Sequence, residues 1–267
     1  MNFPRFCVFS LIMLSSCAKG GGTNVQASPG ASSSKRIEAA LRNAAIPEAF
    51  AQKILGFNEA IFLSALEAAT TGDAYLHLLV DKKHPLIPLG YAPADLVELH
   101  NGTYQVSRAG LMLRRDAEKA LAAMAAAAQA DGVTLTASSA YRSYKYQVEV
   151  YARNVRENGQ AAADRESARP GYSQHQTGLA VDFGSITDAF AGTAAGKWMA
   201  VNAPRFGWSI SFPDGYEAVT GYRWESWHFR YVGIPLAEFI TVWFAGIQQY
   251  ALQFIYEWER LEGGGNG

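Results

Sequence analysis

The chain has 267 residues, 49% of them hydrophobic, and a formal net charge of −1. A chain of this length can bury one substantial core, or a core plus a small appendage. The balanced charge lacks the basic excess that nucleic-acid binding requires, so we expect no nucleic-acid partner.

The N-terminus, MNFPRFCVFSLIMLSSC, reads as a secretory signal. One Arg precedes an apolar stretch from Phe6 to Leu14 that is too short to span a bilayer. Its end, LSSC, resembles a bacterial lipobox, in which Cys17 becomes the lipidated N-terminus; the alternative is ordinary cleavage near this point. Either cleavage leaves at most one of the two cysteines, so no intrachain disulfide is expected. We expect export to the bacterial cell envelope and attachment to a membrane through a lipid anchor.

Two segments follow this signal. Residues 18–35 are rich in Gly, Ser and Ala without an apolar period, which predicts a flexible linker. Residues 36–72 form a helical extension, because apolar residues from Arg36 to Ala69 recur at helical spacing, broken by Pro47 and by Gly56–Asn58. Three short helices are therefore expected. The extension could bind the wall or simply pack on the main domain, and the absence of recognisable chemistry favours packing.

Residues 73–262 are expected to form the main domain. The alanine-rich stretch Leu113–Ala130 predicts a helix that stops at Asp131-Gly132. Further elements are a strand in VTLTASSAYRS, a helix over Tyr144–Asn158, a helix closing at Gly207, strands in WSISFP and YRWESWHFRYVG, and one long packed helix over Pro235–Leu261. Helices followed by several irregularly spaced strands indicate an α+β domain with a central antiparallel sheet flanked by helices.

The stretch YSQHQTGLAVDF contains a candidate metal site. Asp182 closes an apolar run, and a buried carboxylate is costly unless it is paired or bound to a metal. His175 and His228 are its candidate partners. Two imidazoles and one carboxylate leave a tetrahedral ion an open position, which is typical of a catalytic zinc site. Strand alternation predicts that Leu179 and Val181 face away from Asp182.

Two further residues are candidates for catalysis. Glu225 lies three residues before His228, and we expect a bend at the strand's entry to turn it toward the metal, where it could act as the general base. Arg142 lies where a strand meets a helix and could stabilise an oxyanion. From spacing alone, a surface Arg pairing with a local carboxylate is an equal alternative, and His175, Asp182 and His228 do not form a compact motif.

Together these residues resemble the zinc D-alanyl-D-alanine peptidases of the VanY carboxypeptidase and VanX dipeptidase type. The family has the pattern SxHxxGxAxD, a glutamate shortly before Trp-His, and YRS followed by Gln. The matching residues are Ser173, His175, Gly178, Ala180 and Asp182; Glu225, Trp227 and His228; and Tyr141, Arg142, Ser143 and Gln147. The resemblance runs from about Leu78 to Tyr250. Ala140 stands where the family often has Gly, a departure in a supporting position.

The resemblance implies a hedgehog/DD-peptidase fold and assigns roles to residues. His175, Asp182 and His228 would bind Zn²⁺, Glu225 would be the base, and Arg142 would stabilise the oxyanion. The implied substrate-binding residues are Tyr141, Ser143, Gln147 and Ser173. Residues 73–262 would thus be the zinc peptidase domain, while the helices up to Ala69 lie outside the match.

The implied activity is removal of the C-terminal D-alanine from peptidoglycan stem peptides by metal-activated water. LD-carboxypeptidase, D,D-dipeptidase and L-alanyl-D-glutamate endopeptidase activities on the same peptides remain open. A wall-binding lipoprotein without catalysis would predict substitution of Glu225 or of a ligand, and none is substituted. A purely structural zinc is disfavoured because such sites are normally closed by four protein ligands. We expect a monomer.

Overall fold

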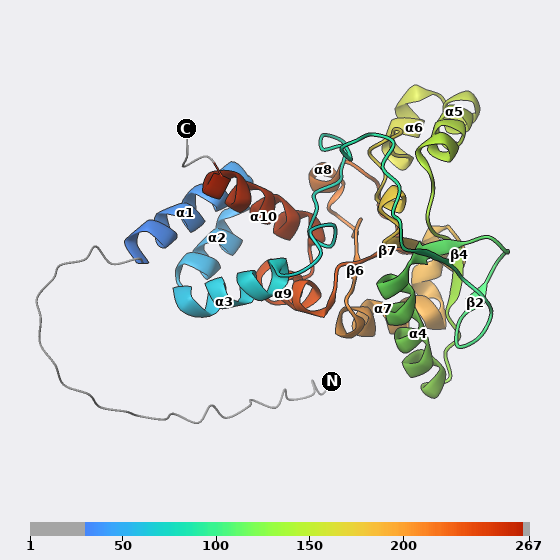
Figure 1. The fold of residues 1–267 in the computed structure, drawn as a ribbon, viewed down its shortest axis with the longest axis horizontal. Coiled ribbons are helices and arrows are strands. Elements are labelled where there is room, and N and C mark those ends of the chain that lie inside the picture. The colour runs from blue at the N-terminus through green and yellow to red at the C-terminus, as the bar shows by residue number, and fades with distance from the viewer. Residues whose placement is uncertain (1–29, 264–267) are drawn as a thin grey trace, which may run out of the picture.

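The computed structural model describes residues 30–263 of the chain. The predicted signal peptide at 1–17 with Cys17, and the predicted linker up to residue 29, lie outside the described residues. Figure 1 shows two parts, a group of helices and a larger part built on a sheet. Among the described residues, no helix combines the length and apolar character that crossing a membrane requires.

The helical module consists of helices from both ends of the chain. It contains α1 (Gly30–Asn43), α2 (Glu48–Leu55), α3 (Glu59–Thr70), α9 (Ile234–Phe244) and α10 (Gln248–Gly263). The three N-terminal helices were predicted, and Asn58 caps α3 by accepting a hydrogen bond from the Ile61 amide. These helices share one hydrophobic core, in which Phe62 of α3 packs against Phe239, Trp243 and Phe254. The domain boundary between residues 72 and 73 remains a prediction. The hydrophobic core of the helices before this boundary also contains residues of α9 and α10, from the C-terminal end of the chain.

Two details of the helical module differ from the sequence prediction. Helix α1 begins at Gly30, so the last residues of the segment expected to be a flexible linker are helical. Adding residues to a helix that already packs against a core costs little, whereas starting a new helix is unfavourable. The single helix expected over Pro235–Leu261 is two helices, because Ala245 and Gly246 both adopt positive φ, at 50° and 83°.

The larger part is built on a five-stranded sheet with the order β2-β4-β5-β7-β6. Its strands are β2 (Gln105–Val106), β4 (Thr136–Ser139), β5 (Ala180–Phe183), β6 (Trp208–Ile210) and β7 (His228–Tyr231). The four strands from β4 to β6 pair antiparallel, while β2 pairs parallel with β4 at one edge. A separate pair joins β1 (Leu96–Glu98) to β3 (Met112–Arg114). The α+β fold with a largely antiparallel sheet is confirmed.

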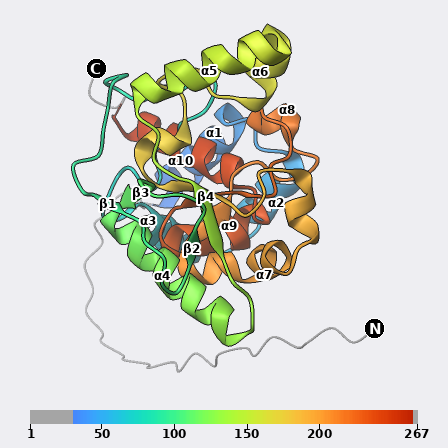
Figure 2. The same cartoon turned by 90° about the vertical axis from the view of Figure 1, so that its right-hand side faces the viewer.

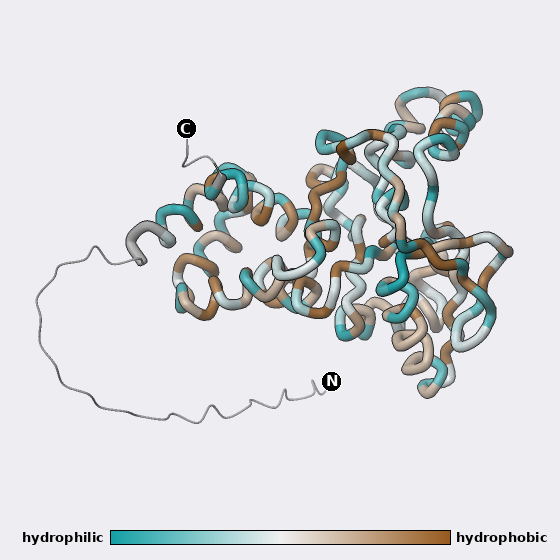
Figure 3. The backbone as a smooth tube through the Cα atoms, viewed as in Figure 1, coloured by the Kyte–Doolittle hydropathy of each residue, from teal (hydrophilic) through white to brown (hydrophobic). Residues whose placement is uncertain are grey.

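Helices pack around this sheet. A second hydrophobic core joins the strands to α4 (Arg115–Ala130) and α7 (Ala194–Asn202). In Figure 2, α5 (Tyr144–Asn158) and α6 (Gln160–Glu166) lie at the opposite end of the molecule from α4 and α7. In Figure 3, α4 is teal where it begins, because charged residues occupy its first turn, and pale over most of the remainder, where alanine dominates. The remaining elements are α8 (Glu217–Thr220) and the 3-10 helices η1 (Gln174–Thr177), η2 (Asp188–Gly192) and η3 (Ala203–Phe206).

A buried arginine joins the two parts. Arg230 of β7 is 0% exposed, and its Nη2 donates to the carbonyls of Tyr75, Leu76 and Leu78, in the segment that leads from α3 into the larger part. Burial lowers the pKa of Arg230 to about 10. This guanidinium ties the connecting segment to the strand that carries His228.

Candidate metal centre and active-site cleft

Sheet register brings Asp182 and His228 together. Strand β5 pairs antiparallel with β7, and Asp182 lies directly opposite His228 in this pairing. Leu179 and Val181 belong to the hydrophobic core, as strand alternation predicted. Asp182 Oδ1 lies 3.0 Å from His228 Nδ1. Residues 46 positions apart in the chain therefore meet because of one strand pairing.

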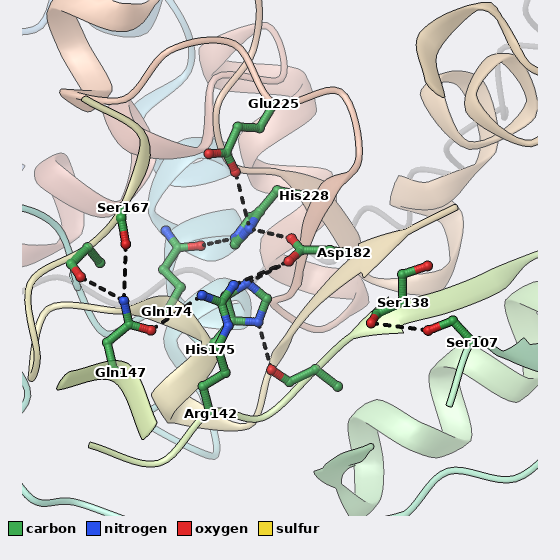
Figure 4. A network of polar contacts seen from close by, with 12 residues as sticks. Ser107, Ser138, Arg142, Gln147, Ser167, Gln174, His175, Asp182, Glu225 and His228 are labelled. Atoms are coloured by element: carbon green, nitrogen blue, oxygen red, sulfur yellow. Dashed lines mark hydrogen bonds and ion pairs between the residues drawn. The ribbon is translucent and has the colours of Figure 1, made fainter. Parts of the chain in front are cut away.

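A tight turn adds His175. This residue lies in η1, which ends at Gly178 in the left-handed conformation with φ of 70°. A Cβ at Gly178 would lie 2.9 Å from Arg114 Cγ, so a larger residue would not fit without a shift. The chain therefore folds back at Gly178 between His175 and Asp182. It places His175 Nε2 3.2 Å from Asp182 Oδ2. Figure 4 shows the three side chains converging, and their ligand atoms lie within 4.8 Å of one another.

The hydrogen bonds around this cluster fit a metal ion. His175 Nδ1 lies 2.8 Å from the Ala140 carbonyl, which can only accept, so Nδ1 carries the proton. His175 Nε2 is then a bare lone pair, buried and without a hydrogen-bond partner among the described residues, and it faces a carboxylate oxygen. Two such electron-rich atoms repel each other unless a cation lies between them. A zinc ion suits imidazole and carboxylate donors.

Burial and charge set the protonation states of two of these groups. Burial, reinforced by the Arg142 guanidinium, lowers the pKa of His175 to about 4. Burial alone would raise the pKa of Asp182, but the two histidines hold it well below its usual value. The pair therefore consists of a neutral imidazole and a carboxylate at neutral pH, which are the protonation states that metal ligation requires.

Glu225 faces the same cluster from the turn that precedes β7. The His228 amide donates to the Glu225 carbonyl, so the chain bends between these residues as predicted. Glu225 Oε2 lies 3.6 Å from His228 Nδ1 (Figure 4). Burial, with the Asp182 charge nearby, raises the pKa of Glu225 to about 8. A carboxyl group with a pKa in this range can both take and return a proton near neutral pH.

Arg142 reaches the cluster from the loop between β4 and α5. Its Nη2 donates to Asp182 Oδ2 at 3.2 Å, and its Nη1 donates to Gln147 Oε1 at 3.3 Å. Gln147 is 0% exposed, and its amide nitrogen donates to the Ala168 carbonyl at 2.7 Å. The Arg142 side chain is 19% exposed and points into the cluster, where the carboxylate that it pairs with is Asp182. Gln147 thus holds the Arg142 guanidinium in place through its hydrogen bond with Nη1.

The cleft over the cluster has a volume of about 460 Å³. Among the four residues predicted to bind substrate, Ser173 belongs to its lining, together with His175, Asp182, Glu225, His228 and Arg142. Ser143 instead caps α5, accepting from the Tyr146 amide at 3.1 Å. Tyr141 donates its backbone amide to the Met112 carbonyl. Ser143, Tyr141 and Gln147 thus shape the loop that carries Arg142, and they do not belong to the cleft lining.

Sequence reasoning missed Gln174 and Ser211. The Gln174 Oε1 lies 3.1 Å from His228 Nε2, and the Ser211 hydroxyl donates to the same oxygen at 2.7 Å. Gln174 occupies a variable position of the SxHxxGxAxD pattern, so no motif marks it. Its sequence position next to His175, a predicted metal ligand, was the available signal, because such histidines usually have a second polar partner.

Comparison with known proteins matches the part of the chain that contains this cluster. The family model described as VanY, D-alanyl-D-alanine carboxypeptidase, matches residues 110–234. The Bacillus subtilis (strain 168) protein YodJ, named as a carboxypeptidase, is 37% identical over 191 residues, which cover 69% of each chain. A D-alanyl-D-alanine carboxypeptidase of Enterococcus faecalis (strain ATCC 700802 / V583) is 34% identical over 60% of this chain and 59% of its own length. The chain thus spans less than two thirds of this second relative.

Two solved structures resemble the fold. The LdcB LD-carboxypeptidase is 35% identical with a TM-score of 0.57, over 63% of this chain and 85% of that one. A vancomycin-resistance D,D-pentapeptidase VanY mutant in complex with Zn(II) is 30% identical with a TM-score of 0.55, over 66% of this chain and 98% of that one. The second structure holds zinc.

Proposed function

Because this chain belongs to the VanY family of D-alanyl-D-alanine carboxypeptidases, we propose that it is a zinc peptidase that removes the C-terminal D-alanine from peptidoglycan stem peptides. The observation that carries the proposal is the buried cluster of His175, Asp182 and His228, with the Glu225 carboxyl group facing it. The two imidazoles and the carboxylate would hold Zn²⁺ through His175 Nε2, His228 Nδ1 and an Asp182 oxygen.

Each neighbouring side chain has a role in this proposal. When bound, zinc would supply a Lewis acid that polarises the peptide carbonyl and makes water a better nucleophile. Glu225, whose carboxyl group faces the cluster 3.6 Å from His228 Nδ1, takes a proton from the attacking water and returns it to the leaving amine. Arg142 donates to the oxygen that becomes negative as the carbonyl is attacked. Gln147 keeps the guanidinium in position for this contact.

We propose the C-terminal dipeptide of the substrate from the ligand of a related structure. One solved structure, VanYB in complex with D-alanine-D-alanine, is 28% identical over 72% of this chain and has a TM-score of 0.55. We extend this substrate to the cleft, with Ser173 as a contact for the peptide. The resemblance to the LdcB LD-carboxypeptidase makes removal of D-alanine from a tetrapeptide the second candidate.

Mass spectrometry of muropeptides tests the proposal. Purified pentapeptide and tetrapeptide muropeptides are incubated with the protein, with a chelator, and with zinc restored after chelation. We expect the pentapeptide to lose one alanine, chelation to stop this loss, and zinc to restore it. Loss from the tetrapeptide alone would move the assignment to LD-carboxypeptidase activity. No cleavage by a folded, zinc-containing protein would contradict both and favour an endopeptidase or a wall-binding protein.

We also propose an exported location, with Cys17 as the site of a lipid anchor. The LSSC sequence and the apolar stretch before it support this, as does a substrate that lies in the cell wall. Metabolic labelling with a fatty acid should mark the protein and should fail in Cys17→Ala. Labelling that persists in the variant would contradict the anchor and leave the enzymatic proposal untouched.

A further inference from the structure

A buried side chain outside the catalytic set contacts the His228 ring. Gln174 is 5% exposed, and its Oε1 lies 3.1 Å from His228 Nε2 (Figure 4). The hydroxyl of Ser211, itself 2% exposed, donates to the same oxygen at 2.7 Å. The Gln174 amide oxygen therefore lies between His228 Nε2 and the Ser211 hydroxyl, on the side of the His228 ring that faces away from Asp182.

This contact decides which ring nitrogen carries the proton. An amide oxygen can only accept a hydrogen bond, so His228 Nε2 must carry the proton. His228 Nδ1 is then left as a lone pair that faces Asp182 Oδ1 at 3.0 Å. In the other tautomer, Nδ1–H would donate to Asp182 and would occupy the position that a metal needs. Without Gln174, the carboxylate would favour that other tautomer.

We propose that Gln174 is a positioning residue that fixes His228 in its Nε2-protonated tautomer and so keeps Nδ1 free for zinc. The proposal rests on the proposed function for the identity of the metal. His175 has a matching arrangement, since the Ala140 carbonyl accepts from its Nδ1. Each histidine of the cluster thus has one nitrogen held by an acceptor oxygen and the other directed at Asp182.

The support for Gln174 extends into the helical module. Gln248 lies at the start of α10 and is 1% exposed. Its Nε2 donates to the Ser209 carbonyl at 3.3 Å, and its Oε1 lies 3.4 Å from Ser211 Oγ. Helix α10 therefore contacts the end of β6 that presents Ser211 to Gln174. The proposal accordingly gives the helical module a part in metal binding, through Gln248, Ser211 and Gln174 in turn.

Zinc affinity of the purified full-length protein, measured by competition with a chromogenic chelator, tests the first step. Removing an outer hydrogen-bond partner of a metal ligand typically costs about 10- to 100-fold in metal affinity, and we expect a loss of this size in Gln174→Leu. Gln174→Glu keeps an acceptor oxygen and should restore affinity to within about 3-fold of the wild type. Unchanged affinity in Gln174→Leu, or no rescue by Gln174→Glu, would overturn the proposal.

Gln176→Leu is the matched control. Gln176 lies in the same 3-10 helix and is 0% exposed, but its amide donates to the Leu89 and Tyr91 carbonyls instead of facing His228. Its loss should lower the melting temperature while zinc affinity stays the same. If Gln176→Leu weakened zinc binding as much as Gln174→Leu, the effect would be general destabilisation and the proposal would fail.

The tautomer itself can be read by 15N NMR of the metal-free protein, with the His228 signals assigned by their loss in His228→Gln. We expect proton attachment at Nε2 in the wild type and a shift toward Nδ1 in Gln174→Leu. Attachment at Nδ1 in the wild type would refute the proposal directly. Neither the zinc affinity nor the tautomer measurement requires turnover, so a failure of the carboxypeptidase assignment can be distinguished from a failure of the proposal for Gln174.

A pair of substitutions on α10 tests the last step. Gln248→Leu should weaken zinc binding several-fold, a smaller effect than that of Gln174→Leu because it acts through Ser211. Gln249→Leu removes a 2.7 Å bond to Asp81 from the next residue of the same helix and should leave zinc affinity unchanged. Equal effects of the two substitutions would overturn the role given to the helical module.

Discussion

Replacing Glu225 by Gln separates proton transfer from metal binding. The two side chains have nearly the same shape, and Glu225 is 9% exposed in a fixed position 3.6 Å from His228 Nδ1. The substitution therefore removes a titratable group without opening a cavity. The three proposed ligands, His175, Asp182 and His228, are unchanged, so we expect zinc affinity to change little.

The expected loss of activity follows from the role of the carboxylate. A positioned general acid–base contributes about 10² to 10⁴ in rate, so kcat/KM should fall by this factor in Glu225→Gln. At 1.36 kcal/mol for each tenfold change, this corresponds to about 2.7 to 5.4 kcal/mol of transition-state stabilisation. Because Glu225 acts on the reacting water instead of on the bound peptide, the loss should lie in kcat, with KM nearly constant.

Release of D-alanine from a pentapeptide, measured together with zinc content, is the assay. Glu217→Gln makes the same change in charge at an exposed carboxylate that pairs with Arg165, and it should leave kcat/KM within about 2-fold of the wild type. A fall of less than about 10-fold in Glu225→Gln would refute its role as the base. So would a fall matched by an equal loss of bound zinc.

Three further outcomes follow. Arg142→Lys cannot keep both guanidinium contacts, so kcat should fall about 10²-fold in steady-state kinetics, and wild-type kcat would exclude its role at the oxyanion. Phe62→Ala, at a fully buried site, should lower the free energy of unfolding by about 3–5 kcal/mol in urea titrations; a loss below about 1 kcal/mol would show that α3 is not part of the core. Hydrogen bonds from Arg169, Tyr151 and Gln160 hold the pKa of Asp164 in the folded protein below its usual value. The ionised Asp164 therefore stabilises the folded state at pH values above its pKa in the unfolded chain, and this stabilisation is lost as the pH falls toward its pKa in the folded protein. In Asp164→Asn the urea midpoint should therefore fall less between about pH 6 and pH 3 than in the wild type, and an equal fall would contradict this.

The candidate metal cluster could be predicted from the sequence because a buried charged side chain is energetically costly unless it has a partner. A carboxylate at the end of a buried strand requires a partner, and strand alternation fixes the direction in which Asp182 points. The pairing of Asp182 with His228 is set by the register of β5 on β7, which spacing along the chain does not reveal. The sequence named His228 as a candidate partner of Asp182, and the family resemblance then implied the same set of ligands.

Other features depend on contacts between distant segments. The family resemblance predicts Gln147 as a substrate contact, but only the structure shows that its fully buried amide bonds to Arg142 and to the Ala168 carbonyl. Local propensity favoured one helix across Ala245, but the chain turns there, and α9 and α10 both pack into the module core. The parallel pairing of β2 with β4 is likewise a tertiary contact between short segments that no periodicity marks.

The contact between α1 and α10 determines how the molecule responds to a pull. Arg36 in α1 donates to the Trp258 carbonyl at 2.7 Å, lies over the Trp258 ring at 3.6 Å and pairs with Glu262 at 3.0 Å. Tension applied through the chain that precedes Gly30 loads these contacts first. Asp182 and His228 lie beyond them on the paired strands β5 and β7, and His175 lies in η1. The two ends of the described chain are thus held to each other, and a pull on α1 reaches α10 through Arg36 before it reaches the sheet.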